Sequence, residues 1–204
     1  MVGPVMLRFL LVLCIALLTC GATAGSRVTV TSAKVDIDHD GTLETVSIEM
    51  ISGRRYNDDA LWCGKGEKYE GSFAVVVDIH GRRVVTLLDP LLGGGPLWFR
   101  TQSWKLVMGD YNDTGEIDFN LGQYGDCNGW RYRMFSIRPD GRIETVSPEF
   151  RANDFVESTS RITRLEKGFS VTNYDNSRGG NWETTYRWNS TARMFEKESE
   201  RRVD

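Results

Sequence analysis

The sequence predicts an all-β fold built from short antiparallel strands. Apolar and polar residues alternate in short runs, which is the period of a half-buried strand. Glycine, aspartate, asparagine and proline interrupt these runs at intervals of ~8–12 residues, as turns between strands do. No apolar pattern with the period of a helix continues for long. Together these observations favour a β-sandwich, a β-barrel or a β-propeller.

The first 24 residues of the 204-residue chain are expected to form a signal peptide. Arg8 supplies a positive charge, residues 7–18 are almost continuously apolar, and Ala-Thr-Ala at 22–24 offers a cleavage site. An uncleaved membrane anchor is the weaker alternative, because the apolar run is short for a bilayer. A lipoprotein is a third, since Leu-Leu-Thr-Cys at 17–20 resembles a lipidation box with Cys20 as the acceptor. We expect one secreted or periplasmic domain over residues 25–204.

The charge balance of this domain bears on its partners. Without the signal peptide the chain has 24 basic and 28 acidic residues, a net charge of −4. Phosphate contacts need a basic surface, which argues against nucleic acid as the main partner. No later segment has the length and apolar character of a transmembrane helix, so none is expected after the signal is removed.

The predicted strands follow one another along the domain. Residues 73–79 and 82–88 flank His80-Gly81 and form the clearest hairpin. The other expected strands are 27–35, 44–51, 104–108, 130–137, 142–146, 162–165, 169–174, 182–188 and 193–197. Residues 52–72 and 89–96 are expected to be long loops, because they are rich in glycine and polar residues. At most a short helix is expected near 148–156.

Two cysteines, Cys63 and Cys127, remain after the signal peptide. In an exported protein such a pair most simply forms one disulfide bond, which would tie down the 52–72 loop. A metal site and free thiols are the alternatives. Zinc is disfavoured, because neither cysteine has a CxxC partner or a nearby histidine.

The most informative motif is Asp-Ile-Asp-His-Asp-Gly-Thr-Leu-Glu at residues 36–44, called loop one below. Calcium takes six to eight oxygen ligands, and carboxylates at alternate positions can wrap one ion. Gly41 at the sixth position permits the sharp turn, and the residue at the seventh would offer its backbone carbonyl. Ser47 replaces the glutamate of a standard EF-hand loop, and the flanks are strands. The predicted ligands are Asp36, Asp38, Asp40, Thr42 and Glu44.

A second copy, loop two, covers residues 110–118, and its Gly115 aligns with the glycine of loop one. Thr114 takes the place of an acid, so loop two should bind calcium more weakly or not at all. A polar turn is the alternative for a single loop, because Asp, Asn and Gly are turn residues. The repetition favours calcium. The predicted ligands are Asp110, Asn112, Thr114, Glu116 and Asp118.

These two motifs, Asp-x-Asp-x-Asp-Gly-x-x-Glu at 36–44 and Gly-Asp-Tyr-Asn-Asp-Thr-Gly-Glu-Ile-Asp at 109–118, resemble the calcium loops of FG-GAP and VCBS repeats in integrin-type β-propellers. Residues 119–125, 130–137 and 182–195 are similar in style to exported bacterial proteins with such repeats. The resemblance implies a propeller-like all-β fold stiffened by calcium, but a fold analogy does not fix a function. Periplasmic inhibitors of lysozyme-type hydrolases are a related group of similar size.

Signs of catalysis are few, and no catalytic residue is predicted. His39, at a non-ligand position of loop one, and His80, at a hairpin turn, are interpreted as surface residues. The motifs of zinc proteases, serine hydrolases and phosphate-binding loops do not occur. Carboxylates such as Asp58, Asp59 and Glu67 are plentiful. A glycan-active hydrolase or lyase with a carboxylate pair is therefore the alternative function.

Aromatic residues are numerous, and core packing is the simplest role for most of them. Trp62 and Tyr69, in the expected 52–72 loop, and Trp98, after the glycine run at 93–95, are expected to be exposed and to contact a partner. We therefore expect an exported, calcium-stabilised binding protein. Its partner would be a protein, with a cell-wall hydrolase as one candidate, or a polysaccharide.

Overall fold

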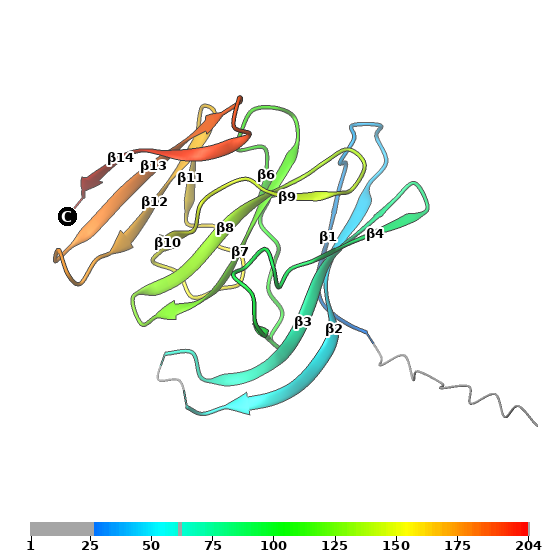
Figure 1. Ribbon diagram of the computed structural model, residues 1–204, viewed down its shortest axis with the longest axis horizontal. Coiled ribbons are helices and arrows are strands. Elements are labelled where there is room, and N and C mark those ends of the chain that lie inside the picture. The colour runs from blue at the N-terminus through cyan, green and yellow to red at the C-terminus, as the bar shows by residue number, and fades with distance from the viewer. Residues whose placement is uncertain (1–26, 61–62, 204) are drawn as a thin grey trace, which may run out of the picture.

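The computed structural model describes residues 27–60 and 63–203, and every regular element in these ranges is a β-strand (Figure 1). The strands form three antiparallel sheets, called A, B and C, which follow one another along the chain. The all-β prediction is confirmed, and the short helix expected near 148–156 is wrong, because a strand occupies 150–152. The expected signal peptide and Trp62 lie outside the described residues.

Sheet A contains the strands that precede residue 101. They are β1 (Val28–Val35), β2 (Glu44–Asp58), β3 (Gly66–Ile79), β4 (Arg82–Leu87) and β5 (Leu97–Arg100). β1 to β4 pair in chain order, and β5 pairs with β3 as well. β4 lies along residues 74–79 of β3, and β5 lies along residues 68–71.

Sheet B repeats this scheme. Its strands are β6 (Met108–Gly109), β7 (Ile117–Asp126), β8 (Gly129–Ile137), β9 (Ile143–Thr145) and β10 (Phe150–Ala152). β8 carries β9 and β10 on different parts of its length, as β3 carries β4 and β5. Sheets A and B are therefore two copies of one arrangement, although the sequence shows the repeat only in the two acidic loops.

Sheet C closes the chain with four strands in sequential order. They are β11 (Ile162–Leu165), β12 (Gly168–Tyr174), β13 (Asn181–Asn189) and β14 (Met194–Arg202). The β11–β12 turn therefore corresponds to loops one and two, which join the first two strands of sheets A and B.

Two cores lie on opposite faces of sheet B. Successive residues of a strand point to opposite sides. On β8, Phe135 and Ile137 enter the first core with residues of sheet A, while Trp130 and Tyr132 enter the second with residues of sheet C. Sheet B is thus the shared layer, and the elements between its strands can contact both neighbours.

The stretch 52–72 was expected to be a loop, and this expectation is wrong for most of it. Its two ends belong to β2 and β3, which pair from Met50↔Phe73 to Asp58↔Gly66 as a curved arm (Figure 1). The glycines that suggested a loop allow close approach, since a Cβ on Gly53 would lie 2.2 Å from the Glu70 carbonyl oxygen. Near the tip, Cys63 is bonded to Cys127 in the β7–β8 turn, with Cα atoms 5.3 Å apart.

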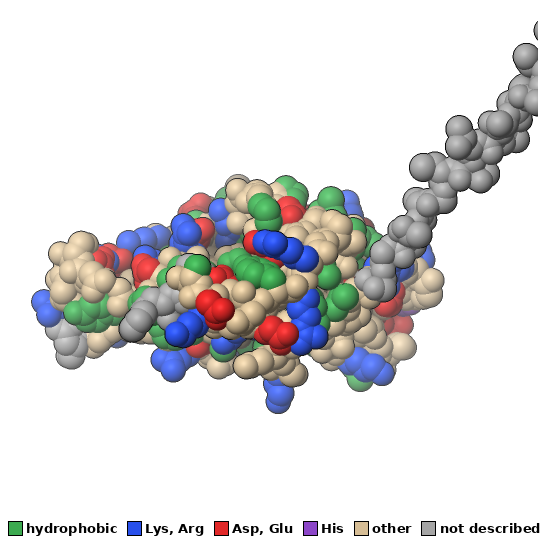
Figure 2. Space-filling view, turned by 90° about the horizontal axis from the view of Figure 1, so that it is seen from below, with side chains coloured by type: hydrophobic (Ala, Val, Ile, Leu, Met, Phe, Trp, Pro, Cys, Tyr) green, Lys and Arg blue, Asp and Glu red, His purple; other side chains and the backbone are tan. Residues whose placement is uncertain are grey.

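The surface is mixed in charge. On the face drawn in Figure 2, basic and acidic side chains alternate over short distances without a large field of one sign. Many of them pair across strands, as Arg54 does with Glu70 and Arg201 with Glu183. No helix within residues 27–60 and 63–203 is long and apolar enough to span a membrane.

An acidic residue of sheet C should make stability depend on pH. Glu200 accepts a hydrogen bond from Arg178 at 2.5 Å and pairs with Lys197 at 3.2 Å, which lowers its pKa from 4.5 to about 2. A depressed carboxyl pKa stabilises the fold above pH 4.5, and this stabilisation is lost as the pH falls towards 2. We expect Glu200→Gln to shrink the fall in melting temperature between pH 6 and pH 3. Glu198→Gln is the control, because Glu198 forms an exposed pair with Arg187. If both variants reduce the fall in melting temperature equally, Glu200 is not the source of the pH dependence.

Candidate metal centre

Loop one folds around its own carboxylates. The chain turns sharply because His39 and Gly41 have positive φ angles of 62° and 88°. The loop's carboxylates accept four backbone hydrogen bonds: Gly41 N to Asp36 Oδ2 (3.1 Å), Asp40 N to Asp38 Oδ1 (3.3 Å), Thr42 N to Asp40 Oδ1 (2.7 Å) and Ile37 N to Glu44 Oε2 (2.8 Å). These bonds fix the side chains on the inside of the turn.

Three of these carboxylates converge. Asp36, Asp38 and Glu44 each place one oxygen within 4.8 Å of the other two. Glu44 is 4% exposed, and Asp36 Oδ1 is buried and has no hydrogen-bond partner within residues 27–60 and 63–203. A buried carboxylate oxygen without a partner is costly unless a donor or a cation compensates it. A set of oxygen ligands of this kind suits a hard cation such as calcium.

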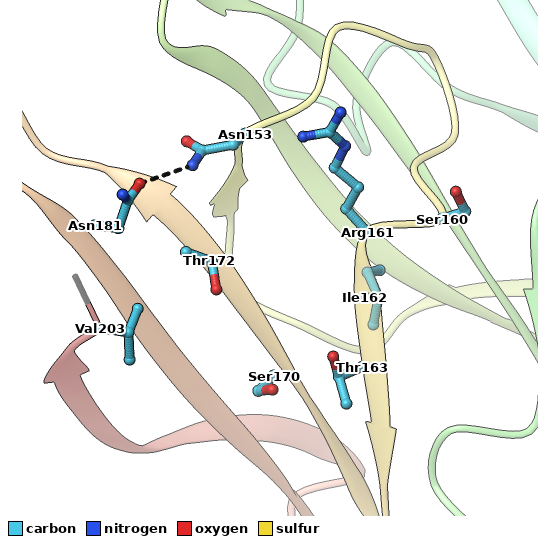
Figure 3. A pocket seen from close by; sticks show the side chains of 9 residues that line it. All are labelled: Asn153, Ser160, Arg161, Ile162, Thr163, Ser170, Thr172, Asn181 and Val203. Atoms are coloured by element: carbon cyan, nitrogen blue, oxygen red, sulfur yellow. Dashed lines mark hydrogen bonds between the residues drawn. The ribbon is translucent and has the colours of Figure 1, made fainter.

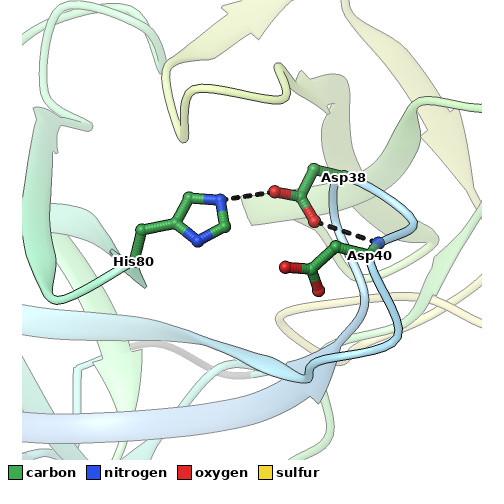
Figure 4. Close-up of side chains that lie close together, drawn as sticks. All are labelled: Asp38, Asp40 and His80. Carbon is green, nitrogen blue, oxygen red and sulfur yellow. Dashed lines mark hydrogen bonds and ion pairs between the residues drawn. The ribbon is translucent and has the colours of Figure 1, made fainter.

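His80 approaches the same loop from the β3–β4 turn (Figure 4). Its Nε2 lies 2.6 Å from Asp38 Oδ2, and it forms a second group with Asp38 and Asp40 whose ligand atoms lie within 4.8 Å of one another. Asp38 therefore belongs to both groups. The sequence could not reveal this contact, because His80 and Asp38 are 42 positions apart.

Loop two has the same internal hydrogen bonds at the same positions. The φ angles of Asp113 and Gly115 are 55° and 83°, close to those of His39 and Gly41. The bonds run from Gly115 N to Asp110 Oδ2 (3.0 Å), Thr114 N to Asn112 Oδ1 (3.0 Å), Glu116 N to Thr114 Oγ1 (3.4 Å) and Tyr111 N to Asp118 Oδ2 (2.9 Å). The two loops are therefore structural equivalents, residue by residue.

The two loops differ in the hydrogen bonds that the carboxylate of their last residue accepts, which is Glu44 in loop one and Asp118 in loop two. Asp118 is fully buried and also accepts hydrogen bonds from the Asn112 amide (3.3 Å) and the Ser136 hydroxyl. Burial raises the pKa of Asp118 to about 7, against the lowering effect of the hydrogen bonds from Ser136 and Tyr111. Glu116 points its carboxylate at Arg138 and Arg193. In loop two, the carboxylate oxygens of Asp118 and Glu116 that a cation would need as ligands are therefore already paired with donors of the protein.

The fourth residue of each loop reaches the next sheet. His39 Nε2 lies 2.7 Å from the Gly115 carbonyl oxygen of loop two. Asp113 accepts hydrogen bonds from Arg164 (2.7 Å) and from the backbone N–H of Lys167 (2.6 Å), at the β11–β12 turn. The three equivalent turns of sheets A, B and C are therefore joined in series.

Two of the three predicted partner-binding aromatics, Tyr69 and Trp98, belong to the described residues, and they lie on opposite faces of sheet A. Tyr69 pairs with Phe99 across β3 and β5, so Trp98 points to the opposite side of the sheet. Tyr69 packs against the first core, and Trp98 packs against Trp130, with ring centroids 5.1 Å apart. Both side chains are half-buried, so each of them contributes to the packing of the fold.

Two polar cavities bear on the alternative of a glycan-active enzyme. One, of about 520 Å³, lies beside sheet C, where Asn153 bonds Asn181 at 3.1 Å, and none of the described residues that line it is an acid (Figure 3). The other, of about 350 Å³, is lined by Asp126 and Asp175. The hydrogen bond from Arg151 lowers the pKa of Asp126, and bonds from Ser177 and Arg178 lower that of Asp175. A general acid needs a raised pKa, so this pair is poorly suited to glycoside hydrolysis.

No protein-family model, no curated protein and no solved structure matches the chain. The resemblance to FG-GAP and VCBS repeats therefore depends on the residues of the two loops alone.

Proposed function

We propose that the chain is an exported binding protein whose fold is stabilised by calcium in loop one. The observation that supports the calcium site is the buried Asp36 Oδ1, which has no partner among the described residues and lies beside the oxygens of Asp38 and Glu44. Calcium would satisfy that oxygen, and the Asp40 carboxylate and the Thr42 backbone carbonyl would complete the ligand set. Export is inferred from residues 1–24.

Calcium here would act on the scaffold. Loop one contacts loop two through His39, and loop two contacts the β11–β12 turn through Asp113. An ion that fixes loop one would therefore stiffen the edge along which the three sheets meet. The propeller-like arrangement that we propose from the resemblance, with the sheets as blades, fits this role. A protein partner, such as a cell-wall hydrolase, or a polysaccharide would then bind a surface that changes little in shape.

Calcium should raise the melting temperature of the wild-type protein, and Asp36→Asn should abolish the increase. At a free concentration of one hundred times Kd, a ligand of the folded state alone adds about 2.7 kcal/mol. In a domain of this size this corresponds to roughly 5–10 °C. The measurement is thermal unfolding by circular dichroism with calcium and with EDTA.

Asp110→Asn is the matched control, because it changes the equivalent first position of loop two. We expect this variant to keep the calcium-dependent increase. If the wild-type protein melts at the same temperature in calcium and in EDTA, loop one is a polar turn and the proposal fails.

A further inference from the structure

The segment 101–107 crosses from β5 in sheet A to β6 in sheet B and has a cavity on each side. One cavity, of about 580 Å³, lies towards β1, and the other, of about 420 Å³, lies towards residues 156–160. Ser103, Trp104 and Lys105 line both. Ligand pockets commonly measure about 300–1,000 Å³. The two cavities adjoin at these three residues and are together called the groove below. A ligand of several units can cover the three residues and enter both cavities.

Trp104 is held firmly at the centre of this groove. Its ring stacks on Phe99 with a centroid distance of 5.8 Å and an interplanar angle of 17°. Its backbone carbonyl accepts a hydrogen bond from the Thr31 hydroxyl at 2.7 Å. Its indole Nε1 is buried and has no acceptor among the described residues. A fixed aromatic ring offers a flat apolar surface, which is complementary to the apolar C–H face of a sugar ring.

The groove is electropositive at its rim. Among the described residues that line the two cavities, Glu157 is the one acid, and its side chain is fully buried. Its carboxylate accepts three hydrogen bonds from Arg100, from the backbone N, Nε and Nη2, at 2.8–3.0 Å. This pair is neutral as a unit. The exposed Lys105 therefore gives the groove a net positive charge.

Hydroxyl groups complete the lining. Ser158 is 4% exposed, and its oxygen accepts the Val107 N–H at 2.9 Å, which leaves its proton to donate. Ser103 and Ser160 also line the cavity beside Glu157. Hydroxyls both donate and accept, as the hydroxyls of a sugar do.

We propose that this groove binds an acidic oligosaccharide, with one sugar ring against Trp104 and a carboxylate paired with Lys105. The two cavities on either side of Trp104 favour a chain of sugars, the aromatic wall and hydroxyls favour pyranose rings, and the charge favours uronate units. This site is separate from loop one and does not depend on the calcium proposal.

The test is titration calorimetry of the full folded chain with three probes at low ionic strength. Hexagalacturonate carries pyranose rings and carboxylates, maltohexaose carries rings without charge, and hexaglutamate carries charge without rings. We expect hexagalacturonate alone to bind, and Lys105→Glu to weaken it about tenfold or more. Arg82→Glu reverses an exposed charge on the β3–β4 hairpin, away from the groove, and should leave binding within about twofold.

Trp104→Phe keeps a ring over Phe99 and identifies the Trp104 indole resonance by its loss from the proton–nitrogen spectrum. That resonance should shift with hexagalacturonate in the wild-type protein. The proposal is overturned if hexagalacturonate does not bind, if Lys105→Glu binds it as tightly as Arg82→Glu does, or if hexaglutamate binds as well. The last result would mark the groove as a site for an acidic peptide.

Discussion

Glu157→Ala is expected to lower the free energy of unfolding by about 4 kcal/mol, because breaking a buried ion pair costs about 3–5 kcal/mol. The Glu157 side chain is fully buried, and it takes three hydrogen bonds from Arg100 on β5. Its own backbone carbonyl accepts the Gly122 N–H of β7 at 2.8 Å. The residue thus joins sheets A and B from the segment between β10 and β11. Its removal leaves the Arg100 guanidinium, 30% exposed, without its anion.

Urea denaturation followed by tryptophan fluorescence measures this change. Glu149→Ala is the matched control, since Glu149 is 44% exposed and lies 3.8 Å from Arg131, and it should cost less than about 1 kcal/mol. The double variant Glu157→Ala with Arg100→Met should recover part of the loss, because it removes the unpaired charge. A Glu157→Ala variant no less stable than Glu149→Ala would show that the pair contributes nothing.

The alternating pattern predicted the all-β class because each half-buried strand has alternating apolar and polar residues within its own segment of the sequence. The assembly of the strands into three sheets has no comparable sequence pattern, because pairing depends on contacts between residues that are far apart in the chain. The 52–72 stretch illustrates the difference. Its glycines and charges resemble a loop, yet Lys68 is fully buried, with its ammonium 2.8 Å from Asp58 and 4.0 Å from the Trp98 ring. A buried lysine needs partners that only the folded arm supplies.

The same distinction applies to the candidate site. The predicted ligand positions of loop one could be read from spacing, because its hydrogen bonds join residues at most seven positions apart. The contact between His39 and Gly115 spans 76 positions and could not be predicted. The hydrogen bond from the Ser136 hydroxyl to Asp118 could not be predicted either, and this bond distinguishes loop two from loop one. Local motifs indicate which side-chain oxygens of a loop converge, and the tertiary fold determines which of these oxygens already accept hydrogen bonds from the protein.

Phe169→Ala is expected to destabilise the protein by about 4 kcal/mol, since large aromatic truncations in a core cost about 3–5 kcal/mol. Phe169 is fully buried in β12, and its ring lies 4.9 Å from that of Tyr186 and 5.0 Å from that of Phe195 within sheet C. Its ring also lies 5.2 Å from Phe150 of β10 and 6.4 Å from Tyr111 of loop two. Phe169 is therefore a central side chain in the packing of sheet C on sheet B.

Hydrogen exchange should locate this loss. Among the described hydrophobic residues of sheet A, the half-buried Trp98 alone packs against the second core, whereas sheet C supplies Phe169, Val171, Tyr186 and Phe195. Amides of β12 and β13 in Phe169→Ala should therefore lose more protection than those of β2 and β3. Phe155→Ala, at a side chain 40% exposed, is the control and should change stability by less than about 0.5 kcal/mol. Equal loss of protection in sheets A and C would mean that the three sheets open as one unit, and that Phe169 supports the whole fold.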